Sequence, residues 1–244
     1  IRPTAAGVAD YPDGRTRTAH WGPYWLPAET RGPWQDLTVA TPADRQLEWL
    51  RRRGRCYLNT LPVNLLTLAE AAGGDASLRP DLAGILTIGE LVRPEHRSCA
   101  REMFGTRISD QYSTIECGVI AGECPVSGHM HVHAESMLLE AVRADGSPCE
   151  TGEEGFASIT PLYSYAMPLI RYVLSDLITV LEPCACGRGL PHISIAGGRL
   201  RSRFRFSDGT LVAADFRMSK NSALVGATRW QWAQVAPETL ELRF

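Results

Sequence analysis

Lysine is almost absent from this chain of 244 residues: Lys220 is the single lysine among 25 lysine and arginine residues. The bias is typical of a GC-rich genome, and it leaves any mechanism that needs a catalytic lysine with one candidate. Long apolar runs are absent as well. None approaches the ~20 residues of a membrane-spanning helix, so we expect no membrane partner. Neither sign of charge prevails, because the formal net charge is −2, and we expect no nucleic-acid partner.

Cysteine is present, but not in the pattern of a disulfide framework. The seven cysteines are an odd number at irregular spacing in a chain of ordinary size. No signal-peptide pattern opens the chain. We therefore expect reduced thiols and a cytoplasmic location, and because the first residue is Ile1 we also expect a chain cut at its N-terminus. With 44% hydrophobic and 21% charged residues, the composition predicts a packed globular protein rather than a disordered one.

The first half of the chain alternates between helical and strand patterns, after a Pro- and Gly-rich start at 1–42 that predicts irregular structure with at most short strands. Helices are expected over 43–53, 62–72 and 94–103, and short strands over 84–88 and 106–110. This β–α–β rhythm is typical of a parallel sheet.

The chain after residue 118 is rich in strand patterns. Strands are expected over 130–142, 154–161 and 177–182, followed by a hairpin over 203–212 and a last strand over 239–244. This half is expected to be antiparallel or mixed. The predicted fold class is therefore mixed α/β, with a parallel part followed by a β-rich part.

Four residues have the chemistry of a metal site: Cys124, His131, Cys184 and Cys186. Three thiolates and an imidazole suit tetrahedral zinc with no open position, which would be a structural site. His129 and His133 compete with His131 for the imidazole position. Two alternatives stay open, namely unrelated buried thiols beside surface histidines, and a strained disulfide between Cys184 and Cys186.

Three further patches could bind a nucleotide. The first, Asp110–Gly118, places hydroxyls and a carboxylate just past the predicted strand, where Glu116 could hold Mg²⁺; a capped turn explains this patch equally well. In the second, Asp176 could accept hydrogen bonds from a ribose, and an ion pair with Arg171 is the simpler alternative. In the third, Arg199 follows a glycine and could reach a phosphate.

Taken in order, these patches resemble the phenylacetate–CoA ligase and coenzyme F390 synthetase branch of the adenylate-forming enzymes. That branch has a Tyr-Gly-x-Thr-Glu signature, then Glu-Cys and a His, then Pro-Leu-Ile-Arg-Tyr-x-x-x-Asp, Cys-x-Cys-Gly-Arg and a hinge Gly-Arg. The corresponding segments here are Tyr112–Glu116, Glu123-Cys124 with His131, Pro168–Asp176, Cys184–Arg188 and Gly198-Arg199. Upstream, 46–50, 57–62 and Gly89-Glu90 also look like the family, so the resemblance covers about 43–244.

The resemblance implies a large adenylation domain over 1–197, with its zinc-bearing β-rich part at about 119–197, and the hinge and start of a small α+β lid over 198–244. It implies formation of an acyl adenylate from a small carboxylic acid, aromatic or not, and ATP, followed by transfer to a thiol, usually that of coenzyme A. Thr114 would lie near the phosphates, Glu116 would hold Mg²⁺, and Arg199 would approach the nucleotide. The implied cofactor-binding set is Gly89, Glu90, Asp110, Gln111, Tyr112, Ser113, Arg171 and Asp176.

The chain also departs from the family pattern. Ser113 replaces the Gly, and Ile115 replaces a Thr and offers no hydroxyl to a phosphate. Leu174-Ser175 stands where Thr-Gly commonly precedes the Asp, and Arg201-Ser202 where acidic residues follow the hinge. The phosphate loop is missing from the 244 residues, and Lys220 does not match the lid lysine.

Three functions therefore remain open. The first is an acid–thiol ligase represented by a partial chain, and the second is a regulatory or catalytically eroded relative that keeps the fold and the zinc. The third is an adenylating enzyme whose acceptor is an amine or a carrier-protein thiol. Assembly into a homo-oligomer is compatible with each of them.

Overall fold

The computed structural model describes residues 12–18, 32–199, 203–213 and 231–243, and the chain divides into two compact units, Ile1–His133 and Ala134–Phe244. Lys220, Arg201 and Ser202 lie outside the described residues. The predicted domain boundary at 197/198 stays a prediction, and strand β11 (His192–Arg199) runs across it. No helix in the described ranges is long and apolar enough to cross a membrane.

The first unit contains a mixed sheet with the strand order β3-β4-β5-β6-β7. Strands β3 (Cys56–Thr60), β4 (Leu82–Thr87) and β5 (Ile108–Thr114) are parallel, which confirms the predicted β–α–β rhythm and adds β3 to it. Strands β6 (Gly118–Glu123) and β7 (Met130–Val132) then continue the sheet in antiparallel fashion. Before them, β1 (Arg15–Thr18) and β2 (Trp34–Asp36) form a separate two-stranded sheet.

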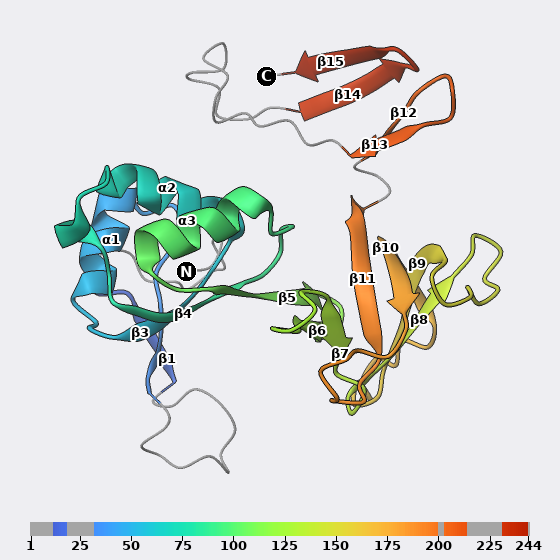
Figure 1. Ribbon diagram of the computed structural model, residues 1–244, viewed down its shortest axis with the longest axis horizontal. Helices are drawn as coiled ribbons and strands as arrows, with labels where there is room; N and C mark the ends of the chain where they lie inside the picture. Colours follow the sequence, from blue (N-terminus) through green and yellow to red (C-terminus); the bar gives the residue numbers. More distant parts are fainter. Residues whose placement is uncertain (1–11, 19–31, 200–202, 214–230, 244) are drawn as a thin grey trace. The chain divides into compact units, whose positions relative to one another are not determined.

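Three helices pack beside the parallel strands (Figure 1): α1 (Ala43–Arg51), α2 (Pro62–Ala72) and α3 (Pro94–Phe104), with a short 3-10 helix η2 (Ala76–Leu78) after α2. Helix α2 has a proline in its first turn and ends at Gly73, whose φ of 55° is left-handed, as the sequence predicts. Leucines from α1, α2, β3 and β4 form the core with residues of α3, among them Leu47, Leu65, Leu58, Ile85 and Ala100. Burial of this apolar surface holds the helices on the sheet.

A buried polar network joins α1, α2 and β3 beneath this core. The Asn64 amide donates to the Gln46 Oε1 at 3.0 Å and to the Thr60 hydroxyl at 3.1 Å. The Gln46 amide in turn donates to the carbonyl oxygen of Thr41 at 2.7 Å. Because each buried group has a partner, the network fixes the helices without a desolvation penalty.

The second unit is β-rich, with the strand order β11-β10-β9-β8. Strands β8 (Met137–Val142), β9 (Glu154–Pro161), β10 (Tyr172–Leu181) and β11 are antiparallel, as expected for this half. Two hairpins follow: β12 (Arg203–Arg205) with β13 (Leu211–Ala213), and β14 (Gln231–Ala236) with β15 (Thr239–Arg243). The first confirms the predicted hairpin over 203–212.

Three strand predictions were wrong at their boundaries. The expected strand over 130–142 is two strands, β7 and β8, one in each unit. Strand β10 begins at Tyr172, five residues before the expected 177. Strand β5 continues to Thr114, so the first nucleotide patch lies largely within a strand and not in a loop after one.

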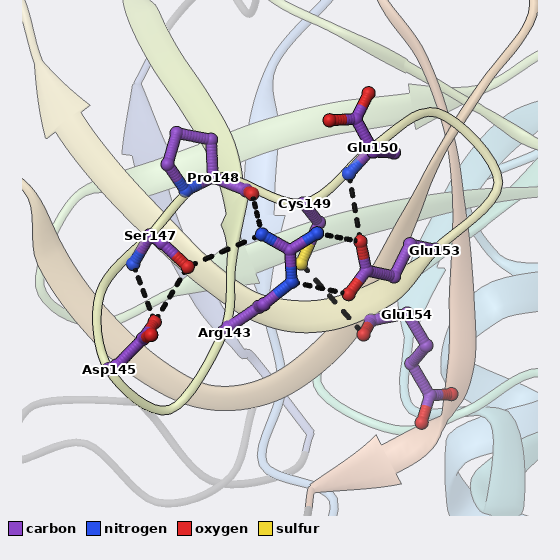
Figure 2. Close-up of polar contacts among 8 residues, drawn as sticks. All are labelled: Arg143, Asp145, Ser147, Pro148, Cys149, Glu150, Glu153 and Glu154. Carbon is purple, nitrogen blue, oxygen red and sulfur yellow. Dashed lines mark hydrogen bonds and ion pairs between the residues drawn. The ribbon is translucent and has the colours of Figure 1, made fainter.

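The β8–β9 connection is held by Arg143, as Figure 2 shows. Its guanidinium donates through Nε to Glu153 Oε1 at 2.7 Å, through Nη2 to Glu153 Oε2, and through Nη1 to the Ser147 hydroxyl and the Pro148 carbonyl. This two-point contact with a carboxylate is the strong geometry for arginine. The Glu153 carboxylate also accepts from the Glu150 N–H at 3.0 Å, so the Arg143 charge is already neutralised within the loop.

Gly155 of β9 has no room for a side chain beside this loop. A methyl group there would lie 2.4 Å from the Cys149 Sγ and 2.8 Å from the Val142 carbonyl oxygen. We expect Gly155→Ala to lower the free energy of unfolding by about 1–3 kcal/mol, the usual cost of overpacking, as measured by urea denaturation.

The matched control is Gly122→Ala, whose methyl group would meet only the His133 Nε2 at an ordinary 3.6 Å. Adding Cys149→Ala to Gly155→Ala should restore only part of the loss, because the Val142 backbone still blocks the methyl group. Equal changes in the free energy of unfolding for Gly155→Ala and Gly122→Ala would contradict this account of the packing.

Candidate metal centre and nucleotide site

The segment with the Tyr112–Glu116 signature forms the end of β5 and the turn into β6. Burial alternates along the strand, so that Asp110, Tyr112 and Thr114 are buried while Gln111 and Ser113 are half-buried. Because successive side chains of a strand point to opposite faces, these five residues divide between two faces of the sheet. A single ligand on one face would meet only one of the two sets.

The β5–β6 turn leaves one predicted magnesium ligand open to solvent. Glu116 is exposed, and the side chain of the neighbouring Ile115 is fully exposed as well. Thr114 is different, because its hydroxyl lies 2.9 Å from the Cys117 Sγ and closes the turn. The carboxylate of Glu116 is thus accessible to a cation, whereas the Thr114 hydroxyl already has a partner within the hairpin.

Asp110 is a buried carboxylate at the carboxyl end of the parallel strands. Its Oδ1 accepts from the Thr87 hydroxyl of β4 at 2.8 Å and from the N–H of Gln111 at 3.0 Å. Burial raises the pKa of Asp110, the two hydrogen bonds and Arg97 lower it in part, and Glu123 raises it further. The structure therefore gives Asp110 an internal role in addition to the predicted one at the nucleotide pocket.

Gly89 and Glu90 follow β4 at the same edge of the sheet. Gly89 has a φ of 81°, a left-handed conformation that favours glycine. Glu90 is exposed, and its carboxylate accepts from the Val63 N–H at 3.3 Å. This contact places a negative charge at the start of α2, where the helix dipole stabilises it.

The second nucleotide patch lies on and before β10. Asp176 is buried on β10, and the strand register pairs it with Arg199, the last residue of β11. Arg171 pairs with Glu140 of β8, with its Nε 3.1 Å from the Glu140 Oε2, and its Nη2 donates to the Gly146 carbonyl at 3.2 Å. The alternative in which Arg171 forms an ion pair with Asp176 is thus replaced by a pair with Glu140.

A groove of about 400 Å³ lies next to this patch. It is lined by Val173, Leu174 and Ser175 of β10, by Phe156 of β9, and by residues of the β8–β9 loop, Arg143, Ala144 and Gly146. Most of these lining residues are apolar, and the Arg143 charge is already bound to Glu153.

The predicted metal ligands come from strand β7, which carries His131, and from two connections between strands, which carry the three cysteines. Cys124 follows β6 in a tight loop, where its N–H donates to the His129 carbonyl at 2.7 Å and its carbonyl accepts from the Gly128 N–H at 2.9 Å. Cys184 and Cys186 lie on the turn after β10, which is closed by Gly187 with a φ of 77°. The ligand atoms of Cys124, His131, Cys184 and Cys186 lie within 4.8 Å of one another.

The surroundings of Cys124 favour a thiolate, the form that binds metals. The N–H of Ser127 makes the largest contribution, and the N–H of Val126, the Ser127 hydroxyl and the His131 side chain add to it. Against the opposing effect of desolvation, they lower the pKa of Cys124 to about 5. Of the three candidate histidines, His131 is the buried one that joins the cluster, whereas His129 is exposed. All seven cysteines are free thiols, so Cys184 and Cys186 form no disulfide.

Sequence reasoning gave no role to three residues around β5: Thr87, Arg97 and Glu123, the last of which appeared only as part of a motif. Arg97 of α3 pairs with Glu123 at 2.8 Å, and the other Glu123 oxygen accepts from the Asp110 N–H at 2.9 Å. A carboxylate directly before a metal-ligating cysteine was the available signal for Glu123. Nothing in the sequence identifies its partners.

No family model matches this sequence, and no curated protein matches it. Among solved structures, the chain is similar to 2-hydroxyisobutyryl-CoA ligase bound to R3-HIB-AMP, at 21% identity and a TM-score of 0.62 over 70% of this chain and 38% of the ligase. An open conformation of that ligase with 2-HIB-AMP and CoA is 19% identical, with a TM-score of 0.60 over 82% of this chain and 48% of the ligase. The anthranilate CoA ligase AuaEII bound to anthranoyl-AMP is 15% identical, with a TM-score of 0.51 over 70% of this chain and 34% of that ligase. The chain thus has the mixed α/β fold of part of these adenylate-forming ligases and spans less than half of their length.

The raised pKa of Asp110 predicts a pH-dependent difference between wild type and Asp110→Asn. The amide keeps an Oδ1 acceptor for Thr87 and Gln111 but carries no charge. Since the folded-state pKa lies above the ordinary Asp value of about 3.9, wild type binds the extra proton when folded and loses stability as pH rises through that window. Urea denaturation at several pH values from about 3 to about 7 measures this. The free energy of unfolding of Asp110→Asn should rise relative to that of wild type as pH increases. A difference that is flat or falls with pH would contradict this.

Proposed function

We propose that this protein activates a carboxylic acid with ATP as an acyl adenylate and then transfers the acyl group to the thiol of coenzyme A. The observation that carries the proposal is that the motif order and the fold agree. Segments that resemble the nucleotide motifs of adenylate-forming enzymes occur in a chain whose fold is similar to that of solved CoA ligases, one of them bound to 2-HIB-AMP and CoA.

The chemistry needs positioning and charge neutralisation more than covalent participation by the protein. In the first step a carboxylate oxygen attacks the α-phosphorus of ATP, and the bond to pyrophosphate breaks. In the second step the thiolate of coenzyme A attacks the acyl carbon, and AMP leaves. Asp176 would bind the ribose, Arg199 would approach the nucleotide, and the solvent-accessible Glu116 would hold Mg²⁺, which neutralises phosphate charge. The residues that would border the adenine and acyl pockets are Gly89, Glu90, Asp110, Gln111 and Tyr112.

The finer assignment that we propose is the phenylacetate–CoA ligase-like branch, with a small carboxylic acid, aromatic or not, as substrate. Its support is the Cys/His pattern together with the Pro168–Asp176 segment. A second candidate is a regulatory relative without turnover. Two observations favour it, because the Thr114 hydroxyl is held by Cys117 and Ile115 stands where a hydroxyl is expected. An amine or a carrier-protein thiol is the alternative acceptor.

We also propose that the cluster of Cys124, His131, Cys184 and Cys186 binds zinc. Three sulfur ligands and one nitrogen ligand with no carboxylate are the donor set of a structural site. The thiolate-favouring loop around Cys124 supports this assignment. The zinc would be held by strand β7 and two strand connections and would take no part in the reaction. The seven free thiols agree with the proposed cytoplasmic location.

The zinc proposal predicts about one zinc per chain in protein purified without added chelator. Cys186→Ser should lower that content severalfold, because a hydroxyl is a much poorer zinc ligand than a thiolate. Metal analysis by mass spectrometry measures it. The control is Cys149→Ser, which removes a thiol outside the cluster and should leave the zinc content unchanged. Metal-free protein of unchanged thermal stability would refute the proposal.

The ligase proposal predicts acid-dependent exchange of labelled pyrophosphate into ATP. The assay uses the protein encoded by the complete reading frame that contains these residues, with a panel of aromatic and aliphatic acids. Asp176→Ala should reduce the exchange by about 10-fold or more, since loss of a positioning contact that costs about 1.4 kcal/mol in the transition state already slows the reaction about 10-fold.

The matched control is Asp208→Ala, which removes an exposed carboxylate in the β12–β13 turn and should leave the exchange unchanged. No exchange with any acid, together with no binding of ATP, would exclude the ligase and favour the regulatory relative. Exchange without formation of acyl-CoA would favour an amine or carrier-protein acceptor.

A further inference from the structure

Glu123 occupies the junction between the two candidate sites. It is the last residue of β6, its side chain is only 10% exposed, and the metal ligand Cys124 follows it directly. In the sheet it pairs with Met130 of β7, next to the pair of Gly122 with the metal ligand His131. Glu123 is therefore the direct chain neighbour of the metal loop, and a change in the conformation of that loop acts on it first.

The two carboxylate oxygens of Glu123 bind two different elements of the first unit. Oε1 lies 2.8 Å from the Nη1 of Arg97 on α3, and Oε2 accepts from the N–H of Asp110 on β5 at 2.9 Å. The last β5–β6 pair at this end of the ladder is Gln111 with Gly122. Asp110 thus lies one residue beyond the β5–β6 pairs, and its N–H donates to the side chain of Glu123 instead of to the backbone of β6.

The contact continues through Asp110 to the next strand. Its carboxylate accepts from the Thr87 hydroxyl of β4, so α3, β6, β5 and β4 are joined by three consecutive polar contacts. Strand β5 carries Gln111, Tyr112 and Thr114 of the proposed nucleotide site. A charged hydrogen bond that is largely shielded from water is worth more than a surface ion pair, which makes this link able to hold β5 in register.

We propose that Glu123 is a positioning residue that couples the metal loop to the nucleotide strand. Metal bound by Cys124 and His131 orders the end of β6, and Glu123 passes that order to β5 through the Asp110 N–H. The inference rests on the proposed zinc site and, in calling β5 the nucleotide strand, on the proposed ligase function. The coupling itself is a property of the fold and is measurable without substrate.

Hydrogen exchange read by mass spectrometry tests the coupling on the complete protein, with zinc as the probe. In wild type, removal of zinc by a chelator should raise exchange in peptides that cover 110–114 by about 10-fold, within the usual range of coupling between sites. Peptides that cover β9 should change much less. Adding zinc back should restore protection.

Glu123→Gln is the central variant, because it keeps the size of the side chain but has one neutral acceptor oxygen in place of two charged ones, so it cannot bind Arg97 and the Asp110 N–H together. It should show fast exchange in 110–114 with and without zinc, while its zinc content stays near one per chain. Arg97→Met, which removes only the α3 contact, should retain part of the zinc response. If Glu123→Gln does not fold, the wild-type protein still decides, since a zinc response no larger in 110–114 than in β9 contradicts the coupling.

Two results would overturn the proposal. One is an equal zinc response of 110–114 in Glu123→Gln and wild type. The other is a uniform rise in exchange across β5 and β9 on zinc removal, which would mean that the metal stabilises the whole fold. Because neither readout needs ATP, the coupling can fail while pyrophosphate exchange succeeds, and the reverse.

Discussion

Two carboxylates, Asp110 and Glu123, are buried close together where the parallel strands give way to the antiparallel hairpin. Buried carboxylates of like charge are unfavourable unless each is paired or hydrogen-bonded. Here Arg97 supplies the counter-charge, and the Thr87 hydroxyl and two backbone N–H groups supply the hydrogen bonds. Removing one partner would leave a buried charge without compensation. This constraint therefore fixes α3, β4, β5 and β6 together and sets the position of every candidate residue on the hairpin.

The elements that were predicted from the sequence are those set by local signals. Pro62 and Gly73 mark the ends of α2, and the apolar run at 84–88 predicts β4. The polar run from Asp110 to Thr114 was expected beyond a strand, since polar residues usually indicate a loop. It is a strand because residues 111–114 pair with β6, while Thr87 and Glu123 bind the buried polar groups of Asp110. Likewise the partner of Arg171, Glu140, lies 31 residues earlier, and no local pattern identifies it. The Cys/His cluster was predictable because cysteine and histidine carry metal-binding chemistry in their identity.

The fold and the departures from the family motifs bear on different parts of the function. In the second unit the strand register pairs Asp176 with Arg199, and in the first unit Glu116 is exposed on the β5–β6 turn. The changed residues concentrate at Ser113 and Ile115, where a phosphate would be held. A protein with this combination could bind an adenylate and yet form it slowly. Binding and turnover are therefore separate questions for this chain.

The most direct measurement is the binding of a stable acyl-adenylate mimic, a phenylacetyl sulfamoyl adenosine. Isothermal titration calorimetry measures this binding to the protein from the complete reading frame. The sulfamoyl linkage replaces the reactive phosphate, so binding is measured without chemistry. The account predicts one site per chain and at least about 10-fold weaker binding for Asp176→Ala, a loss of about 1.4 kcal/mol. Absence of binding, or equal binding by wild type and Asp176→Ala, would contradict an adenylate site in this fold.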